Sequence, residues 1–467
     1  MSRSKATLIK NYKPTDFSHE LKQRSMFKQL NQTIHHEDFK LAEQFLIIGG
    51  NAEDDTPEVI YKYPDFNIEQ FMYEILVEFL YPRGVMKSRK TANSEDELHM
   101  FKEKAKNSAK HVSRFSTFFF TSSIVGCTRY AHCLSQARII QKDGLNYVED
   151  EIFYVMLTLS TRNSVIFSFL EQLLDEPETQ NWSTTPSSIH LTDHFKMFFT
   201  LPSTYTEKIY LNPQVDALLD IPCHICRCLF LRVIPMDYLV LFVSTLLLEK
   251  RLFIKCEHKC LVSSLIAFLV EAIYPFQFEF PIISVLTNSL YDLMDSPTPL
   301  IVGLFETPKE IPAESVLYDI DSKTLTFFPP SFKQQIPQFP NANRVVCGLK
   351  ESTKQIRKQP NHPMSYCIQK HESVISQCLN IIQIELKNMV VEFEDFCISS
   401  RTENNRIVSM FMKTEFIEYS SRKGRVFLKE FLQTQMFENW KTKMLIDMDE
   451  KKNSSISSDG GEETKTI

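Results

Sequence analysis

The stretch MDYLVLFVSTLLLEKRLFIKC, residues 236–256, decides the fold class of this chain. Its first part, 236–249, is apolar over a length typical of a buried helix. A charged break at Lys250 and Arg251 separates this run from 252–256, an apolar run of strand length. A buried helix that leads directly into a buried strand is typical of α/β layers, in which helices cover a mostly parallel sheet.

The alternation of strand and helix patterns continues on both sides of this stretch. Apolar runs of strand length lie at 152–159, 228–234, 282–286 and 300–305, and helical spacing of apolar residues occurs at 165–174 and 261–273. We therefore predict an α/β fold with a largely parallel sheet over residues 150–306. Upstream and downstream, the patterns predict a short strand at 45–48, a helix at 68–79, a charged loop at 87–104, a strand at 115–121 and a strand pair within 317–328, followed by mostly helical structure.

Composition shifts divide the chain into segments, which we predict to be 1–38, 39–140, 150–306, 315–445 and 446–467. The first segment has an excess of basic side chains, Arg3, Lys5, Lys10, Lys13, Lys22, Arg24 and Lys28, over four acidic ones, Asp16, Glu20, Glu37 and Asp38. Such an arm would attract an anionic membrane, and the alternative is a solvated, poorly ordered terminus. Residues 332–364 are rich in Pro, Asn, Gln and Lys and predict a mobile insertion, and 446–467 predict a disordered tail.

Composition also argues against several classes of function. The 467 residues carry a formal net charge of −6, so we expect no nucleic-acid partner. Only 10 residues are glycine, and none completes a GxGxxG or P-loop pattern, so we expect no nucleotide cofactor bound in either way. The 11 cysteines, an odd number without a secretory signal, indicate reduced thiols in the cytoplasm. The longest apolar stretches, 236–248 and 261–276, are shorter than the ~20 residues that span a bilayer.

The sequence PCHIC at 222–226 is the sharpest candidate for a metal site, because zinc deaminases use a PCxxC motif. Those enzymes also need an HxE motif, which His35-His36-Glu37 supplies far upstream. A second interpretation pairs Cys223 and Cys226 with Cys256 and Cys260, across a spacer that is long for such a site. We favour cysteines that pack in the core and expect no metal. Catalytic motifs of the GxSxG or HExxH type are absent from the sequence.

Adjacent residues on a strand point to opposite faces, so His132 and Cys133 cannot form a catalytic pair. We interpret them as a surface histidine beside a core cysteine.

Three motifs in a fixed order resemble the central part of a DENN domain: LLLEKRLFI at 246–254, AIYPF at 272–276 and DSPTPLIVG at 295–303. Flanking pieces resemble the upstream and downstream modules of that family, namely FLYP at 79–82, FFFT at 118–121, Arg129-Tyr130, YDID at 318–321 and FLQTQMF at 431–437. Ala131 stands where the family usually has glycine. The resemblance covers about residues 40–440.

The signature residues also have structural interpretations. Leu248 belongs to a helix core, Glu249 and Arg251 form an ion pair or cap the start of a strand, and Pro275 ends a helix. A proline-stiffened turn would lead into the next strand. The signature side chains are Leu248, Glu249, Arg251, Tyr274, Pro275, Pro297, Pro299 and Gly303. We expect them to identify the fold rather than to touch a partner.

The resemblance implies a two-lobed α/β architecture, with a longin-like upstream lobe at 39–140 and a second lobe built from the central module, 150–306, and the downstream module, 315–445. Proteins similar to this are cytoplasmic guanine-nucleotide exchange factors for Rab GTPases in membrane trafficking, peripheral on vesicle or endosomal membranes. They bind the GTPase between the lobes and need no cofactor. The resemblance therefore implies an enzyme regulator with a Rab-type partner.

The candidate GTPase contacts are Ser160, Thr161, Arg162 and Asn163, in the loop after the strand at 152–159, together with Arg129. Ser160 and Asn163 alternatively cap the next helix. Two other functions stay open at this point. One is GTPase activation through an arginine finger, for which Arg129 and Arg162 are the candidates, and the other is a GTPase-binding scaffold without exchange activity.

Overall fold

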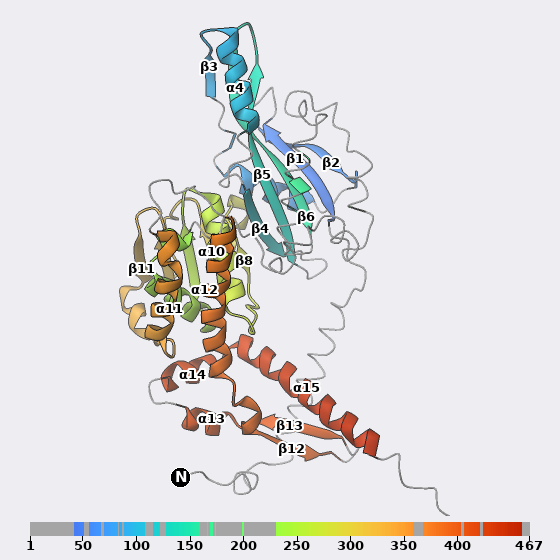
Figure 1. Ribbon diagram of the computed structural model, residues 1–467, viewed down its shortest axis with the longest axis vertical. Coiled ribbons are helices and arrows are strands. Elements are labelled where there is room, and N and C mark those ends of the chain that lie inside the picture. The colour runs from blue at the N-terminus through green and yellow to red at the C-terminus, as the bar shows by residue number, and fades with distance from the viewer. Residues whose placement is uncertain are drawn as a thin grey trace, which may run out of the picture.

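The computed structural model describes residues 42–50, 56–66, 70–82, 84–85, 88–107, 115–121, 128–158, 166, 169–170, 173, 199, 230–357, 368–402, 406–420 and 424–459. These residues form a mixed α/β structure with three sheets (Figure 1). The first sheet is built from the upstream part of the chain, the second from the middle and the third, a two-stranded one, from the C-terminal part.

The first sheet is antiparallel throughout, with the strand order β2-β1-β6-β5-β4 and β3 paired to the outer part of β6. Its strands are β1 (Gln44–Gly50), β2 (Pro57–Tyr63), β3 (Ser88–Thr91), β4 (Phe115–Thr121), β5 (Thr128–Gln141) and β6 (Asn146–Thr158). Strands β5 and β6 form a long hairpin. Its tip carries β3 and the helix α4 (Glu95–Asn107), which together project from the sheet in Figure 1.

Both faces of the first sheet are apolar, because apolar residues follow one another along β1 and β6 instead of alternating with polar ones. Leu46 and Ile48 on one face pack against helix α3 (Gln70–Leu80). Phe45 and Ile47 on the other face pack against buried residues further along the chain, Ile166, Phe169, Leu170 and Leu173.

A buried ion pair joins the two strands of the long hairpin. Arg138 on β5 lies directly opposite Asp150 on β6, and its Nε and Nη2 atoms donate hydrogen bonds of 2.8 and 2.5 Å to the two carboxylate oxygens. Nη2 also donates to the carbonyl of Gly50. The two side chains are only 5% and 0% exposed. This two-point contact fixes the register of three neighbouring strands.

The second sheet has the order β11-β10-β7-β9-β8, and every pair except β10–β11 is parallel. Its strands are β7 (Arg251–Lys255), β8 (Ile282–Ile283), β9 (Ile301–Leu304), β10 (Ser315–Asp319) and β11 (Thr324–Phe328). Leu252 and Ile254 pack against the helices α9 (Met236–Leu247) and α10 (Lys259–Ala272), whereas Phe253 points to the other face, towards the 3₁₀ helix η7 (Asn288–Asp295).

An ion pair joins two parallel strands of this sheet where both end. Lys255 of β7 lies beside Asp319 of β10, with 2.8 Å between Nζ and Oδ2, and the side chains are 20% and 17% exposed. The other oxygen of Asp319 accepts the backbone N–H groups of Asp321 and Ser322 in the turn that follows. Burial alone would raise the pKa of Asp319, but the hydrogen bonds from Lys255 and Ser322 outweigh it, and the net effect is a lowered pKa.

The C-terminal part of the described chain is mostly helical. Its elements are η8 (Pro330–Gln335), α11 (Ala342–Arg357), α12 (Ile368–Met389), η9 (Phe393–Phe396), β12 (Cys397–Arg401), β13 (Ile407–Phe411), α13 (Lys413–Tyr419), α14 (Arg425–Phe431) and α15 (Gln435–Asp459). Helices α11 and α12 share the large core of α9 and α10. An aromatic cluster that includes Phe276, Phe431, Phe437 and Trp440 connects α14 and α15 to this core.

Polar side chains of α15 occupy the second edge of β13, whose first edge pairs with β12. Asp449 accepts the backbone N–H of Ser409, and Asn453 accepts the N–H of Ile407 and donates to its carbonyl. Two side chains of a helix thus take the place of a third strand.

The first sheet packs on the rest of the molecule through its edge strand β4, which contacts α10 and β8. Val285, just after β8, belongs to the same core cluster as Phe118 of β4. Leu290 of η7 packs against both this cluster and the core on the outer face of the second sheet. The two sheets are therefore connected by continuous apolar packing.

Most of the strands and helices predicted from the sequence are confirmed. The elements predicted at 68–79, 115–121, 236–249, 252–256, 261–273 and 300–305 correspond to α3, β4, α9, β7, α10 and β9, and the strand pair within 317–328 is the hairpin β10–β11. The parallel sheet is also confirmed. The strand predicted at 152–159 exists as the end of β6, but it lies in the antiparallel first sheet and not in the parallel one.

Several other predictions are wrong. The predicted loop 87–104 contains β3 and most of α4, and residues 230–233, predicted as part of a strand, are helical. The predicted mobile insertion contains α11, where Val345, Leu349 and Ile356 are buried, while 358–364 lie outside the described residues. The predicted disordered tail is helical as far as Asp459, and 460–467 again lie outside the described residues. His132, expected at the surface, is fully buried.

Candidate functional site

Hydrogen-bonded polar side chains line the end of the first sheet at which β6 stops. Thr158, the last residue of β6, lies opposite Tyr130 of β5. Its Oγ1 is 3.2 Å from Nε2 of the buried His132, and the ring of Tyr130 stacks on the imidazole with 6.4 Å between centroids. The buried imidazole thus has a polar partner, which explains why the interior accepts it. We define the polar rim as Glu43, Gln44, Tyr73, Arg129, His132 and Thr158.

Arg129 is held within the polar rim by Glu43, the residue before β1. Its Nε lies 2.7 Å from Oε2 and its Nη2 lies 3.4 Å from Oε1, so both carboxylate oxygens are engaged. The two side chains are 13% and 21% exposed. An arginine that reaches into a partner's active site would first have to break both hydrogen bonds, so this pairing favours a positioning role for Arg129.

Gln44 extends the polar rim towards α3 and β2. Its amide nitrogen donates to the carbonyls of Pro64 and Phe66, at 3.0 and 2.8 Å, and its amide oxygen accepts the hydroxyl of Tyr73 at 2.9 Å. Gln44 is fully buried. One side chain therefore fixes the chain that leaves β2 relative to the first turn of α3.

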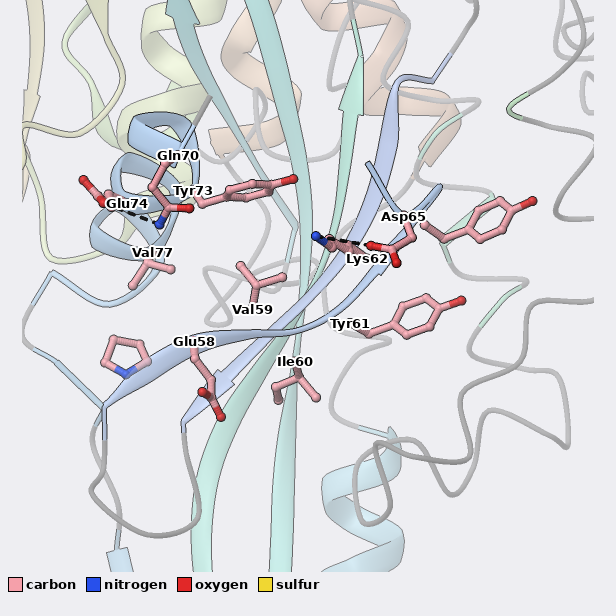
Figure 2. Close-up of a pocket in the computed structure, with 12 residues that line it drawn as sticks. Glu58, Val59, Ile60, Tyr61, Lys62, Asp65, Gln70, Tyr73, Glu74 and Val77 are labelled. Atoms are coloured by element: carbon pink, nitrogen blue, oxygen red, sulfur yellow. Dashed lines mark hydrogen bonds and ion pairs between the residues drawn. The ribbon is translucent and has the colours of Figure 1, made fainter. Parts of the chain in front are cut away.

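Next to this end of the rim, a groove of about 750 Å³ runs between β2 and α3 (Figure 2). Its floor includes Val59 and Val77, and its walls carry charged and aromatic groups. The polar lining residues are Glu58, Tyr61, Lys62, Tyr63, Asp65, Gln70, Tyr73 and Glu74. Figure 2 shows Lys62 turned towards Asp65, and their charged groups are 3.2 Å apart.

Of the GTPase contacts predicted from the sequence, the structure describes Arg129 alone. Ser160, Thr161, Arg162 and Asn163 lie outside the described residues. They follow Thr158, the last residue of β6 and a member of the polar rim, by two to five positions in the sequence.

Glu249, a signature residue, has a role that the sequence did not predict. It ends α9 in a left-handed conformation with φ 51°, a position that favours glycine. Its carboxylate accepts the backbone N–H groups of Gln435 and Met436, at 3.0 and 2.7 Å. These are the first donors of α15, which have no partner within their own helix. Burial raises the pKa of Glu249, and the two N–H groups partly oppose this shift.

Arg251 binds three backbone carbonyls and makes no ion pair with Glu249. Its guanidinium donates to Ser296, Thr298 and Ala313, at 2.7, 3.4 and 2.9 Å. It thereby ties the start of β7 to the turn with Pro297 and Pro299 that leads into β9. Arg251 thus caps the start of β7, as expected, but it does so by binding backbone carbonyls of neighbouring segments.

Gly303 lies where β9 passes close to the backbone after β8. A Cβ atom at this position would lie only 1.8 Å from the carbonyl oxygen of Ser284, far closer than two non-bonded atoms can approach. Glycine is therefore required by this close approach.

The remaining signature residues surround the ends of α9 and α10. Leu248 is buried in the main core directly after α9. Helix α10 ends at Ala272, three residues before Pro275, as predicted, and the peptide bond between Tyr274 and Pro275 is cis. Tyr274 is 57% exposed, and Lys387 of α12 lies over its ring at 5.5 Å.

Cys223 and Cys226, which carried the metal interpretations, lie outside the described residues. Cys256 is buried, and its thiol donates to Asp321 at 3.2 Å. Within the described ranges, no three His, Cys, Asp or Glu side chains are grouped closely enough to hold a metal ion. None of the helices in the described part of the chain combines the length and the apolar character needed to cross a membrane.

Sequence reasoning missed the polar rim and the groove. The rim depends on pairs such as Glu43–Arg129, which are 86 positions apart, and no local pattern indicates such a contact. The groove depends on the side-by-side position of β2 and α3. The only signal in the sequence was the polar character of the short connection between an edge strand and a helix.

Comparison with known proteins identifies a known domain in the middle of the chain. The profile of the DENN (AEX-3) domain matches residues 155–323, which include all three signature motifs. Human DENN domain-containing protein 2A is 26% identical over 253 residues, covering 51% of this chain and 23% of that protein. Human DENN domain-containing protein 2C is 26% identical over 246 residues, or 51% and 25%, and mouse DENN domain-containing protein 2B is 27% identical over 159 residues, or 33% and 13%.

The chain thus matches a quarter or less of the length of these curated relatives. The matched region includes the end of β6, the strands β7 to β10 of the second sheet and the helices α9 and α10, where Glu249, Arg251 and Gly303 make the contacts described above. On the profile, the relatives and the ordered motifs together, residues 155–323 of this chain form a DENN domain.

Proposed function

We propose that this protein is a guanine-nucleotide exchange factor that promotes GDP release from a Rab-type small GTPase in membrane trafficking. The observation that carries the proposal is the DENN domain match over residues 155–323, because this family is generally associated with that activity. The protein would be an enzyme regulator that forms no covalent intermediate. The named relatives support the family, and the activity is our inference from it.

We further propose that the first sheet and the second sheet with its helices correspond to the two lobes of such a factor, the first being longin-like. The GTPase would bind beside the polar rim and would contact Ser160, Thr161, Arg162 and Asn163, which follow Thr158 in the sequence. Arg129 would act as a positioning residue, since its guanidinium is engaged by Glu43.

Exchange requires differential binding. The factor must bind the nucleotide-free GTPase more tightly than the GDP-bound form, so that the transition state for GDP release is stabilised. An acceleration of about 10⁴-fold corresponds to a preference of about 5.5 kcal/mol. Side chains that make hydrogen bonds with the nucleotide-free GTPase alone would supply such a preference, and a preorganised sheet end would lose little freedom in making them.

The membrane is the second proposed partner. Residues 1–38 carry seven basic and four acidic side chains, and each basic residue near an anionic surface contributes about 1 kcal/mol to binding. Such an arm would bring a cytoplasmic protein to the vesicle or endosomal membrane on which its lipid-anchored GTPase resides.

A panel of purified Rab GTPases tests the proposal. Release of a fluorescent GDP analogue and hydrolysis of GTP are measured separately with the full chain. We expect faster GDP release from at least one GTPase and unchanged hydrolysis. Faster hydrolysis would instead support GTPase activation, and binding to all nucleotide states with equal affinity would support a scaffold. Either result contradicts the exchange proposal.

Variants test the proposed contact residues. Replacing Thr161, Arg162 and Asn163 together by alanine should reduce the rate of GDP release at least about tenfold, the effect of losing about 1.4 kcal/mol of differential binding. Glu95→Gln, in the exposed first turn of α4, is the matched control. If the triple variant folds normally and retains full activity, the contact lies elsewhere.

A further inference from the structure

Strand β2 forms one edge of the first sheet, and this edge differs from the opposite one. The other edge strand, β4, contacts α10 and β8, so it is covered by the rest of the molecule. In the described parts of the chain, no strand pairs with the outer edge of β2. The edge strand of a sheet presents backbone N–H and C=O groups to which another extended chain can bind.

The edge of β2 is irregular in its middle. Ile47 of β1 pairs with Tyr61 and Ile48 pairs with Val59, so Ile60 is an extra residue, a β-bulge. A bulge leaves backbone groups out of the ladder and increases the local twist, and it is common beside functional sites. Bulges and charged side chains such as Lys62 also protect edge strands against unselective pairing. This edge therefore requires a partner that matches it specifically.

The lining of the groove beside this edge indicates the chemistry of a partner that would fit it. Three of its lining residues carry carboxylates, Glu58, Asp65 and Glu74, and Lys62 provides the single cation among them. Glu58 and Glu74 are exposed, one on β2 and the other on α3. Val59 and Val77, which pack against the core beside α3, form an apolar floor (Figure 2). The lining thus combines an apolar base with more carboxylates than cations.

An extended chain fits this pattern, because alternate side chains of a strand point to the same face and are spaced about 7 Å apart. A segment alongside β2 would direct basic side chains towards the carboxylates and aliphatic ones onto the apolar floor. A second copy of this groove would place like charges opposite one another. Charge complementarity therefore favours a different protein with a basic, extended segment.

We propose that the groove between β2 and α3 binds a basic, extended segment of a partner protein, which adds to the edge of β2 as a further strand. The Gln44–Tyr73 hydrogen bond keeps the end of the groove in shape before the partner arrives, because it holds the chain after β2 against α3. This site adjoins the polar rim, with which it shares Tyr73, and it adds a second protein partner to the proposed GTPase.

Synthetic octapeptides test the proposal on the full chain. We expect the labelled peptide KVKVKVKV to bind, as followed by fluorescence anisotropy, and EVEVEVEV not to bind. The affinity should fall as salt rises from about 0.05 to 0.3 M, because the contacts are exposed charges. Glu58→Gln with Glu74→Gln should weaken binding about tenfold, with Glu95→Gln of α4 as the matched control. Equal affinity for the double variant and the wild type would overturn the proposal.

Two further arms separate strand addition from simple charge attraction and test other occupants. N-methylation of alternate residues along one edge of the peptide should abolish binding, whereas N-methylation along the other edge should leave it unchanged, because a strand pairs through one edge only. Equal tolerance of both would rule out strand addition. Competition by a Rab GTPase, or an affinity gain above tenfold on deletion of residues 1–38, would assign the groove to the GTPase or to the chain's own terminus and would overturn the proposal.

Discussion

The carboxylate of Glu249 accepts a 2.7 Å hydrogen bond from the backbone N–H of Met436, a residue 187 positions further along the chain. The same glutamate ends α9, where the N–H of Lys250 bonds to the carbonyl of Thr245 and its own N–H bonds to that of Leu246. This pattern is a Schellman motif, in which glycine is the usual residue at the position of Glu249. One side chain therefore couples the end of one helix to the beginning of another.

This coupling predicts an unusual order of stabilities at position 249. Glu249→Ala should lose about 1 kcal/mol of unfolding free energy, because α15 loses its N-terminal acceptor while the left-handed backbone remains unfavourable. Glu249→Gly should lose less, since glycine relieves the backbone conformation. Urea denaturation measures both, and an alanine variant at least as stable as the glycine variant would contradict the assignment.

Gly303→Ala should be severely destabilising, by more than about 3 kcal/mol, or should prevent folding, because the new methyl group would overlap the Ser284 carbonyl oxygen at a distance of 1.8 Å. Gly348→Ala in α11 is the control. Its Cβ would meet only side-chain atoms of Ile381, at 3.3 Å or more, and alanine favours the helix. Thermal denaturation compares the two, and similar melting temperatures would show that the two chain segments separate easily.

The pair Lys255–Asp319 predicts a dependence of stability on pH. The pKa of Asp319 is lowered in the folded protein, so its contribution is complete above the unfolded value near pH 4 and is lost as the pH falls through the folded value. Between about pH 6 and 3 the wild type should therefore lose about 1 kcal/mol more than Asp319→Asn. Urea denaturation at a series of pH values measures this difference, and parallel curves for the two proteins would disprove it.

For the buried pair Arg138–Asp150, we predict that a second substitution restores stability that the first one removes. Arg138→Leu should cost about 3–5 kcal/mol, because it leaves a fully buried carboxylate without a counter-charge. Replacing Asp150 by leucine as well should recover much of this loss, since a buried ion pair is often no more stable than well-packed apolar residues. Chemical denaturation of both variants distinguishes the outcomes. If the double variant is no better than the single one, the loss has another origin.

The sequence predicted best those elements in which burial is dense. Leu252 and Ile254 of β7 and their flanking helices are continuous apolar runs, and runs of that length leave few alternatives to a covered parallel sheet. The signature motifs identified the domain because Glu249, Arg251 and Gly303 satisfy steric and hydrogen-bonding demands that few other residues meet.

Elements with little buried surface were missed. Helix α4 buries chiefly Leu98 and Ala105, so its charged residues dominated the composition and a loop was predicted. In α11, Val345, Leu349 and Ile356 do recur at helical spacing, but the neighbouring prolines and polar residues concealed this pattern.

The candidate site is the part that local patterns could predict least. His132 looked like a surface residue, because the hydroxyl of Thr158 that makes its burial possible is supplied by another strand. Arg129 was identified through its motif, while its partner Glu43 was not. Sites of this kind are defined by contacts between distant residues, which one sequence alone does not reveal.

The bonding of Asp449 and Asn453 to β13 has a consequence for shortened versions of the chain. A variant truncated before Asp449 would retain the hairpin β12–β13 but would expose backbone groups of Ile407 and Ser409 that α15 now occupies. Two strands alone are marginally stable, and an open edge attracts other open edges. The last turns of α15 thus block the open edge of β13 from pairing with another chain, although they contribute little to the hydrophobic core.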